Sequence, residues 1–137
     1  MKDRKSLQVA LLVSIIGCCS YPLIAGLSLL NWQLFGELPL GNVLAALVIA
    51  SLACLVYLLR PRNIYFTVIA WVCLLMAFLW FPVSALLAGN LQLLFSGDKG
   101  QFWTIYTRAT VIISLAALLV ILSIKLFQFI RLRFKQN

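Results

Sequence analysis

The chain has 137 residues, of which 64% are hydrophobic and 10% are charged, and its net charge is +8. A soluble domain is about half apolar and about a quarter charged, and a fold this small cannot bury so much apolar surface. In a soluble protein the positive charge would suggest nucleic acid, but here most basic residues lie at the ends of apolar runs, which favours the lipid bilayer instead.

The first apolar run extends from about residue 7 to residue 30. A helix of roughly 20 apolar residues crosses the hydrocarbon layer of a membrane, so this run is long enough to span. Its sequence Ile15-Ile16-Gly17-Cys18 is similar to a bacterial lipobox, in which Cys18 would be lipidated and the preceding residues removed. The run nevertheless stays apolar to Leu30, whereas a lipoprotein normally turns polar after its cysteine. We therefore expect a retained span, with the lipoprotein signal as the alternative.

Three further runs are long enough to span, at about residues 42–59, 64–89 and 104–129. Pro61 separates the second run from the third and predicts a helix end there. Only helices and closed barrels cross lipid, and barrel strands would alternate apolar and polar residues, which these runs do not. The sequence therefore predicts an all-α membrane protein, a single domain built as a four-transmembrane-helix bundle.

Basic residues predict the orientation of the bundle. They cluster before the first run, between the second and third runs, and after the fourth: Lys2, Arg4 and Lys5; Arg60 and Arg62; Arg131, Arg133 and Lys135. All three clusters fall on one side of a bundle with an even number of spans. The positive-inside rule then places both termini in the cytoplasm, in a multi-pass protein of the plasma membrane or the bacterial inner membrane.

Two polar segments about sixty residues apart have similar sequences. Tyr21-Pro22 precedes NWQLFGE at residues 31–37, and Phe81-Pro82 precedes NLQLLFSGD at residues 90–98. The match needs slips of one residue to align. A duplicated helical hairpin would explain it, with a pseudo-two-fold axis along the membrane normal. The chemistry that helix ends share at the membrane surface is the other explanation, and both remain open.

The predicted loops on the side opposite the basic clusters contain large apolar side chains. The most prominent are Trp32, Phe35, Phe95 and Trp103. These residues either form an aromatic belt in the headgroup layer or offer a docking surface to another membrane protein.

Arg108 is a basic residue near the outer start of the fourth run, on the side where basic residues are rare. It could pair with Asp98 or Glu37, reach lipid phosphates, or bind an anionic ligand or partner. It is therefore a candidate partner-binding residue beside the aromatic loops.

Small residues recur at helical spacing in two runs. Ala46, Ala50 and Cys54 follow one another in steps of four, and Thr110 and Ser114 do the same in the fourth run. Small side chains let helices approach closely in lipid. These residues are predicted helix-packing positions, either within the bundle or against a partner subunit.

Few residues could support chemistry. The chain has no histidine, and its three acids (Asp3, Glu37 and Asp98) lie outside the apolar runs. This composition argues against histidine-ligated haem, the usual zinc sites, carboxylate proton relays and acid–base catalysis. The four cysteines all lie inside runs, where small packing residues are expected. We therefore expect no catalytic residues, no cofactor and no metal.

The sequence favours a non-enzymatic integral membrane protein that acts by contact with another membrane protein or with a second copy of itself. A small accessory subunit fits this description. An immunity protein against a pore-forming toxin also fits, and the chain is similar to such proteins in size and topology only. The alternative is a small oligomeric transporter or channel, which needs a polar path such as a groove lined by Ser14, Thr110 and Ser114.

Overall fold

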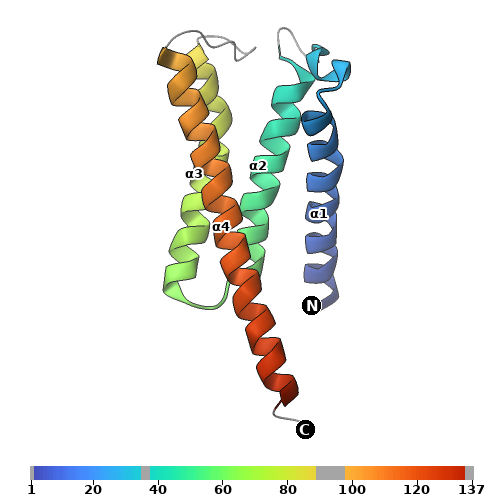
Figure 1. The fold of residues 1–137 in the computed structure, drawn as a ribbon, viewed down its shortest axis with the longest axis vertical. Coiled ribbons are helices and arrows are strands. Elements are labelled where there is room, and N and C mark those ends of the chain that lie inside the picture. The colour runs from blue at the N-terminus through green and yellow to red at the C-terminus, as the bar shows by residue number, and fades with distance from the viewer. Residues whose placement is uncertain (1, 35–37, 89–97, 135–137) are drawn as a thin grey trace.

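A computed structural model describes residues 2–34, 38–88 and 98–134. Figure 1 shows four long helices, each of which is long and apolar enough to cross a membrane. They are α1 (Lys2–Ala25), α2 (Leu40–Leu59), α3 (Ile64–Ala88) and α4 (Asp98–Phe134), with a short 3-10 helix η1 (Ser28–Asn31) after α1. The prediction of an all-helical chain with four candidate spans is confirmed.

The central helix of the bundle is α2. It packs against α1 on one side and against α3 and α4 on the other, and α3 and α4 also pack against each other. Within the described residues α1 has no comparable contact with α3 or α4, and Figure 1 shows it at one edge of the bundle. The structure is therefore a three-helix unit of α2, α3 and α4, to which α1 is attached through α2.

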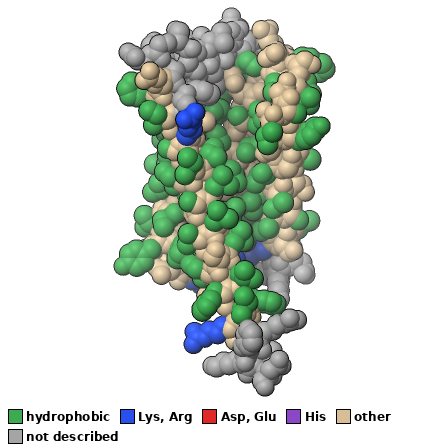
Figure 2. Space-filling view, in the orientation of Figure 1, with side chains coloured by type: hydrophobic (Ala, Val, Ile, Leu, Met, Phe, Trp, Pro, Cys, Tyr) green, Lys and Arg blue, Asp and Glu red, His purple; other side chains and the backbone are tan. Residues whose placement is uncertain are grey.

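The core lies inside the three-helix unit. Its buried members come from α2 (Ile49, Ala53, Val56), α3 (Ala70, Cys73, Ala77, Trp80) and α4 (Ile121). Most other apolar side chains face outward, and Figure 2 shows them covering the middle of the visible face, with Lys and Arg nearer its ends. This distribution suits a bundle whose surrounding solvent is lipid, where helix packing does not depend on expelling water.

The sequence around Pro61 ends α2 and starts α3. Arg60 precedes this proline and leaves the helical region, with φ −54° and ψ 142°, because the proline ring crowds a helical conformation before it. Asn63 then caps α3, since its Oδ1 accepts a hydrogen bond of 3.1 Å from the Tyr65 N–H. A connection this short makes α2 and α3 antiparallel neighbours.

The first span ends earlier than expected. Gly26 has φ 61°, a left-handed conformation that suits glycine and commonly ends a helix, so α1 stops at Ala25 rather than near residue 30. The chain then turns through η1 and reaches α2 through a β-bridge between Gln33 and Pro39. This turn brings the polar residues after η1 to the end of the bundle.

The fourth helix starts earlier and ends later than the predicted span of 104–129. It runs from Asp98 to Phe134, so residues 98–103, expected in a loop, are helical. Its 37 residues span about 55 Å, against about 30 Å of hydrocarbon. Figure 1 shows its C-terminal end extending past the other helices.

The two aromatic-proline pairs both fall inside helices, Pro22 in α1 and Pro82 in α3. The helices do not continue equally, because α1 ends within one turn of Pro22 whereas α3 runs more than a turn beyond Pro82. Residues 89–97, which contain most of the second polar segment, lie outside the described residues. The duplicated hairpin therefore stays a prediction.

Candidate functional site

A cavity of about 550 Å³ lies at the end of the bundle where α1 turns into α2. Its walls come from α1, η1, the start of α2, and the facing parts of α3 and α4. The polar side chains among its lining residues are Asn31, Gln33, Asn42, Trp80 and Thr107. The cavity therefore combines polar residues from the segment between α1 and α2 with the aromatic side chain of Trp80 from α3.

Hydrogen bonds between α3 and α4 fix Trp80 and its neighbours at this side of the cavity. The Trp80 Nε1–H donates to Thr107 Oγ1 at 2.9 Å, and the Tyr106 hydroxyl donates to the Met76 carbonyl at 3.0 Å. The Thr110 hydroxyl donates to the Tyr106 carbonyl at 2.8 Å, within its own helix. The first two of these hydrogen bonds therefore link α3 to α4. Such bonds matter in a membrane, because lipid offers polar side chains no hydrogen-bond partners.

Two buried hydroxyls on these helices are poorly paired. Ser84 is fully buried and has no hydrogen-bond partner among the described residues, and Ser114, 1% exposed, interacts only weakly with the Cys73 thiol of α3. A buried hydroxyl without a good partner lowers the stability of the fold. Each of these two serines therefore either destabilises the bundle modestly or is paired by a polar group from outside the chain.

The predicted helix-packing residues lie inside the bundle or at its partly covered surface. Thr110 and Ser114 are buried, and Ala46 packs against the core. Ala50 and Cys54 are half-buried. These stripes on α2 and α4 therefore serve contacts within the chain, which leaves little of them for a partner.

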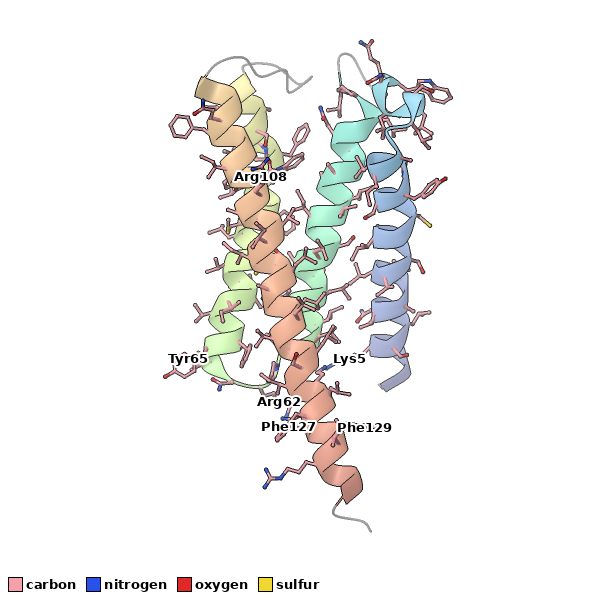
Figure 3. All side chains as sticks on the ribbon, in the orientation of Figure 1. Lys5, Arg62, Tyr65, Arg108, Phe127 and Phe129 are labelled. Carbon is pink, nitrogen blue, oxygen red and sulfur yellow. The ribbon has the colours of Figure 1, made fainter. Side chains whose placement is uncertain are left out.

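The predicted partner-binding residues do not form one described site. The Trp32 side chain is 71% exposed after η1, and Arg108 is exposed on α4. Phe35 and Phe95 lie outside the described residues, as does the side chain of Trp103, whose backbone belongs to α4. The side chains of Asp98 and Glu37, the expected partners of Arg108, lie outside the described part of the structure, and Figure 3 shows Arg108 near the end of the bundle opposite Lys5 and Arg62.

The polar groove considered for a transporter is not formed by the expected residues. Ser14 lies on the exposed side of α1, and its hydroxyl donates to the Ala10 carbonyl at 2.9 Å. Thr110 and Ser114 are buried in the three-helix unit. The three side chains therefore do not line a common surface.

One surface that the sequence reasoning missed lies on α1. Ala10, Ser14 and Cys18 follow one another in steps of four and are all exposed. Gly17, beside them, has no atom within 4 Å of the position that a Cβ would occupy. The spacing is visible in the sequence, but only the packing of α1 against α2 shows that this stripe faces outward.

A second missed feature lies at the opposite end of the bundle. A cavity of about 420 Å³ is lined by Lys5, Arg60 and Arg62, together with Asn63 and Thr67. The sequence treats these cations only as signals of orientation, and the fold brings them to one place.

The described residues contain no group of three His, Cys, Asp or Glu side chains that could hold a metal ion. No known protein family, curated protein or solved structure matches the sequence.

Proposed function

We propose that this chain is a non-enzymatic membrane protein that acts by binding another membrane protein through α1. A small accessory subunit of a membrane complex and an immunity protein against a pore-forming toxin are the two forms of this function. The observation that carries the proposal is the outward-facing stripe of Ala10, Ser14, Gly17 and Cys18 on the helix whose residues are least buried in the bundle.

A small-residue stripe matters on a lipid-facing helix because of its shape. Leu7, Leu11 and Tyr21 are 69%, 56% and 71% exposed on the same helix, so large side chains border the small ones. The result is a notch along the helix surface that a partner helix can approach closely. Association in lipid is driven by such close packing and by hydrogen bonds, since lipid tails are as apolar as the helix.

The low burial of α1 also favours this role. Only 6% of the residues in the apolar window of α1 are buried, against 33% for α2. A helix that contributes so little to its own core is free to present most of its surface to a partner. We further propose that both termini face the cytoplasm, because the basic residues gather at one end of the bundle.

The test is affinity purification of the tagged full-length chain from its native membrane in mild detergent, with quantitative mass spectrometry. We expect one membrane protein to co-purify in stoichiometric amount. Gly17→Leu fills the notch from a position where a Cβ meets no other atom of the chain within 4 Å, and it should lower the recovery of that partner about tenfold, the effect of losing about 1.4 kcal/mol of binding free energy. Ser14→Leu should act in the same direction.

The matched control is Ala116→Leu, the same kind of enlargement at an exposed position of α4. It should leave recovery of the partner within about twofold, because it lies on another helix. Recovery that Gly17→Leu leaves unchanged would contradict the α1 contact. If the chain co-purifies only with its own copies, the proposal of a different partner protein is wrong.

The alternative function is a small oligomeric transporter or channel, and the polar cavity of about 550 Å³ favours it. Buried hydroxyls at Ser84, Thr110 and Ser114 extend polar character from the cavity level along α3 and α4. This function predicts that the purified chain makes liposomes permeable to a small ion or solute. Ser114→Leu should then block the flux, whereas Gly17→Leu should not.

A further inference from the structure

The basic end of the bundle contains a cavity to which two separate parts of the chain contribute cations. Lys5 comes from α1, while Arg60 and Arg62 come from the connection between α2 and α3. The cavity is about 420 Å³ and is open to its surroundings. Figure 3 shows Lys5 and Arg62 near each other at this end of the bundle.

Arg60 is held in place at the edge of this cavity. Its guanidinium lies 3.7 Å from the centre of the Tyr57 ring and donates through Nη1 to the Tyr57 carbonyl. Its Nε–H donates to Thr67 Oγ1 at 3.4 Å. The Tyr57 ring is itself packed edge-on against Trp71, with the ring centres 5.7 Å apart. These contacts use only part of the guanidinium, which has five N–H donors.

Lys5 and Arg62 are both exposed, and both line the cavity. Three like charges that face one cavity repel one another unless an anion reduces the repulsion. The cavity wall also includes Ile64, the first residue of α3, where the helix dipole adds partial positive charge. The site therefore offers a fixed guanidinium, two adaptable cations and a helix start to an anion.

We propose that this cavity binds the phosphate of an anionic phospholipid headgroup. Phosphate accepts several charge-assisted hydrogen bonds at once, which matches arginine and lysine donors arranged around a pocket. The cavity lies where the spans α2 and α3 end, the depth at which headgroups meet a membrane protein. Ile64 lines the cavity, is 69% exposed, and offers apolar surface to the lipid chains.

The bound lipid would connect α1 to the rest of the bundle. Among the helices, α1 contacts mainly α2. A phosphate shared between Lys5 and Arg62 adds a link between the N-terminal end of α1 and the start of α3. Lipid binding should therefore stabilise the folded chain by mass action. The proposal is independent of any protein partner.

The test uses the purified full-length chain in neutral detergent, with lipid binding read by native mass spectrometry and stability by thermal unfolding. The probes are phosphatidylglycerol and phosphatidylcholine with identical acyl chains. We expect phosphatidylglycerol to stay bound and to raise the midpoint of unfolding, and phosphatidylcholine to do neither. Lys5→Gln and Arg62→Gln should each weaken phosphatidylglycerol binding about tenfold, the effect of losing one charge-assisted contact.

Two controls separate a pocket from general charge attraction. Arg4→Gln and Arg131→Gln remove the same charge at the same end but outside the cavity lining, and they should change binding less than about twofold. Arg62→Lys keeps the charge and should retain most of the binding. Circular dichroism of each variant checks that the helices remain folded.

A third probe, inorganic phosphate, identifies the source of the anion. If phosphate at millimolar concentration raises the unfolding midpoint and displaces phosphatidylglycerol, the ligand is a free phosphate ion and the lipid proposal is overturned. Equal binding of the two lipids would also overturn it. So would equal losses in Arg62→Gln and Arg131→Gln, because the effect would then come from net charge alone.

Discussion

The indole of Trp80 in α3 donates a hydrogen bond of 2.9 Å to the hydroxyl of Thr107 in α4. Trp80 is 2% exposed, so its N–H depends on this acceptor. Thr107 also lines the cavity at this end, which places the bond on the boundary between core and cavity. The free energy of this hydrogen bond is therefore one contribution to the packing of α3 against α4.

Removing the bond should cost a modest amount of stability. A double-mutant cycle of Trp80→Phe and Thr107→Val should give a coupling of about 0.6 kcal/mol, the average for side-chain hydrogen bonds between membrane helices, and no more than about 1.7 kcal/mol. The measurement is reversible unfolding in mixed detergent micelles. Tyr21→Phe, which removes an exposed hydroxyl, is the control and should change nothing. A coupling near zero would show that the bond does not form.

The buried hydroxyl of Ser114 should be dispensable for folding. Ser114→Ala removes a buried polar atom that makes no hydrogen bond of ordinary geometry and interacts only weakly with the Cys73 thiol, so we expect unchanged or higher stability, by up to about 1 kcal/mol. Ser123→Ala, at an exposed serine that donates to the Leu119 carbonyl, is the matched control and should stay within about 0.5 kcal/mol. A clear loss in Ser114→Ala would mean that another polar group pairs with this hydroxyl.

The two glycines of the first span should respond in opposite ways to alanine. Gly26→Ala forces a side chain into the left-handed region and should lower the unfolding free energy by about 1–2 kcal/mol. Gly17→Ala lies within α1 with open space around it and should raise the free energy by up to about 1 kcal/mol. Denaturation of the two purified variants, compared with the unmodified chain, checks both signs.

The orientation can be measured with single cysteines in a chain whose four native cysteines are replaced. Ser28→Cys and Ile64→Cys place exposed thiols at opposite ends of the bundle. With both termini in the cytoplasm, a thiol reagent that cannot cross the membrane should label residue 28 in intact cells. It should label residue 64 only after the membrane is opened. The reverse pattern would invert the proposed orientation.

The four spans could be predicted from the sequence because length and apolar composition are properties of each segment alone. The residues at which the helices begin and end were harder to predict. The predicted first span runs on to Leu30 because apolar residues continue, whereas backbone conformation at Gly26 decides where α1 stops. The start of α4 at Asp98 was missed for the converse reason, since a polar first turn gives no hydropathy signal.

The candidate sites depended on tertiary structure in a way that spacing cannot reveal. Small residues at steps of four occur on α1, α2 and α4, and the pattern looks alike in all three. Burial separates them, because Thr110 and Ser114 are covered while Ser14 is exposed. Likewise, Lys5 and Arg62 are far apart in sequence, and only the packing of α1 on α2 places them around one cavity.

The contact pattern of the bundle has a consequence for how the chain assembles during synthesis. Among the described residues, three of the four extensively packed helix pairs (α1 with α2, α2 with α3, and α3 with α4) join neighbours along the sequence. Each of these pairs can close as soon as its second helix has entered the membrane. The contact of α2 with α4 alone must wait for the last helix, so topology imposes little delay on folding. The core around Ile121 is thus completed last, after α1 has already packed against α2.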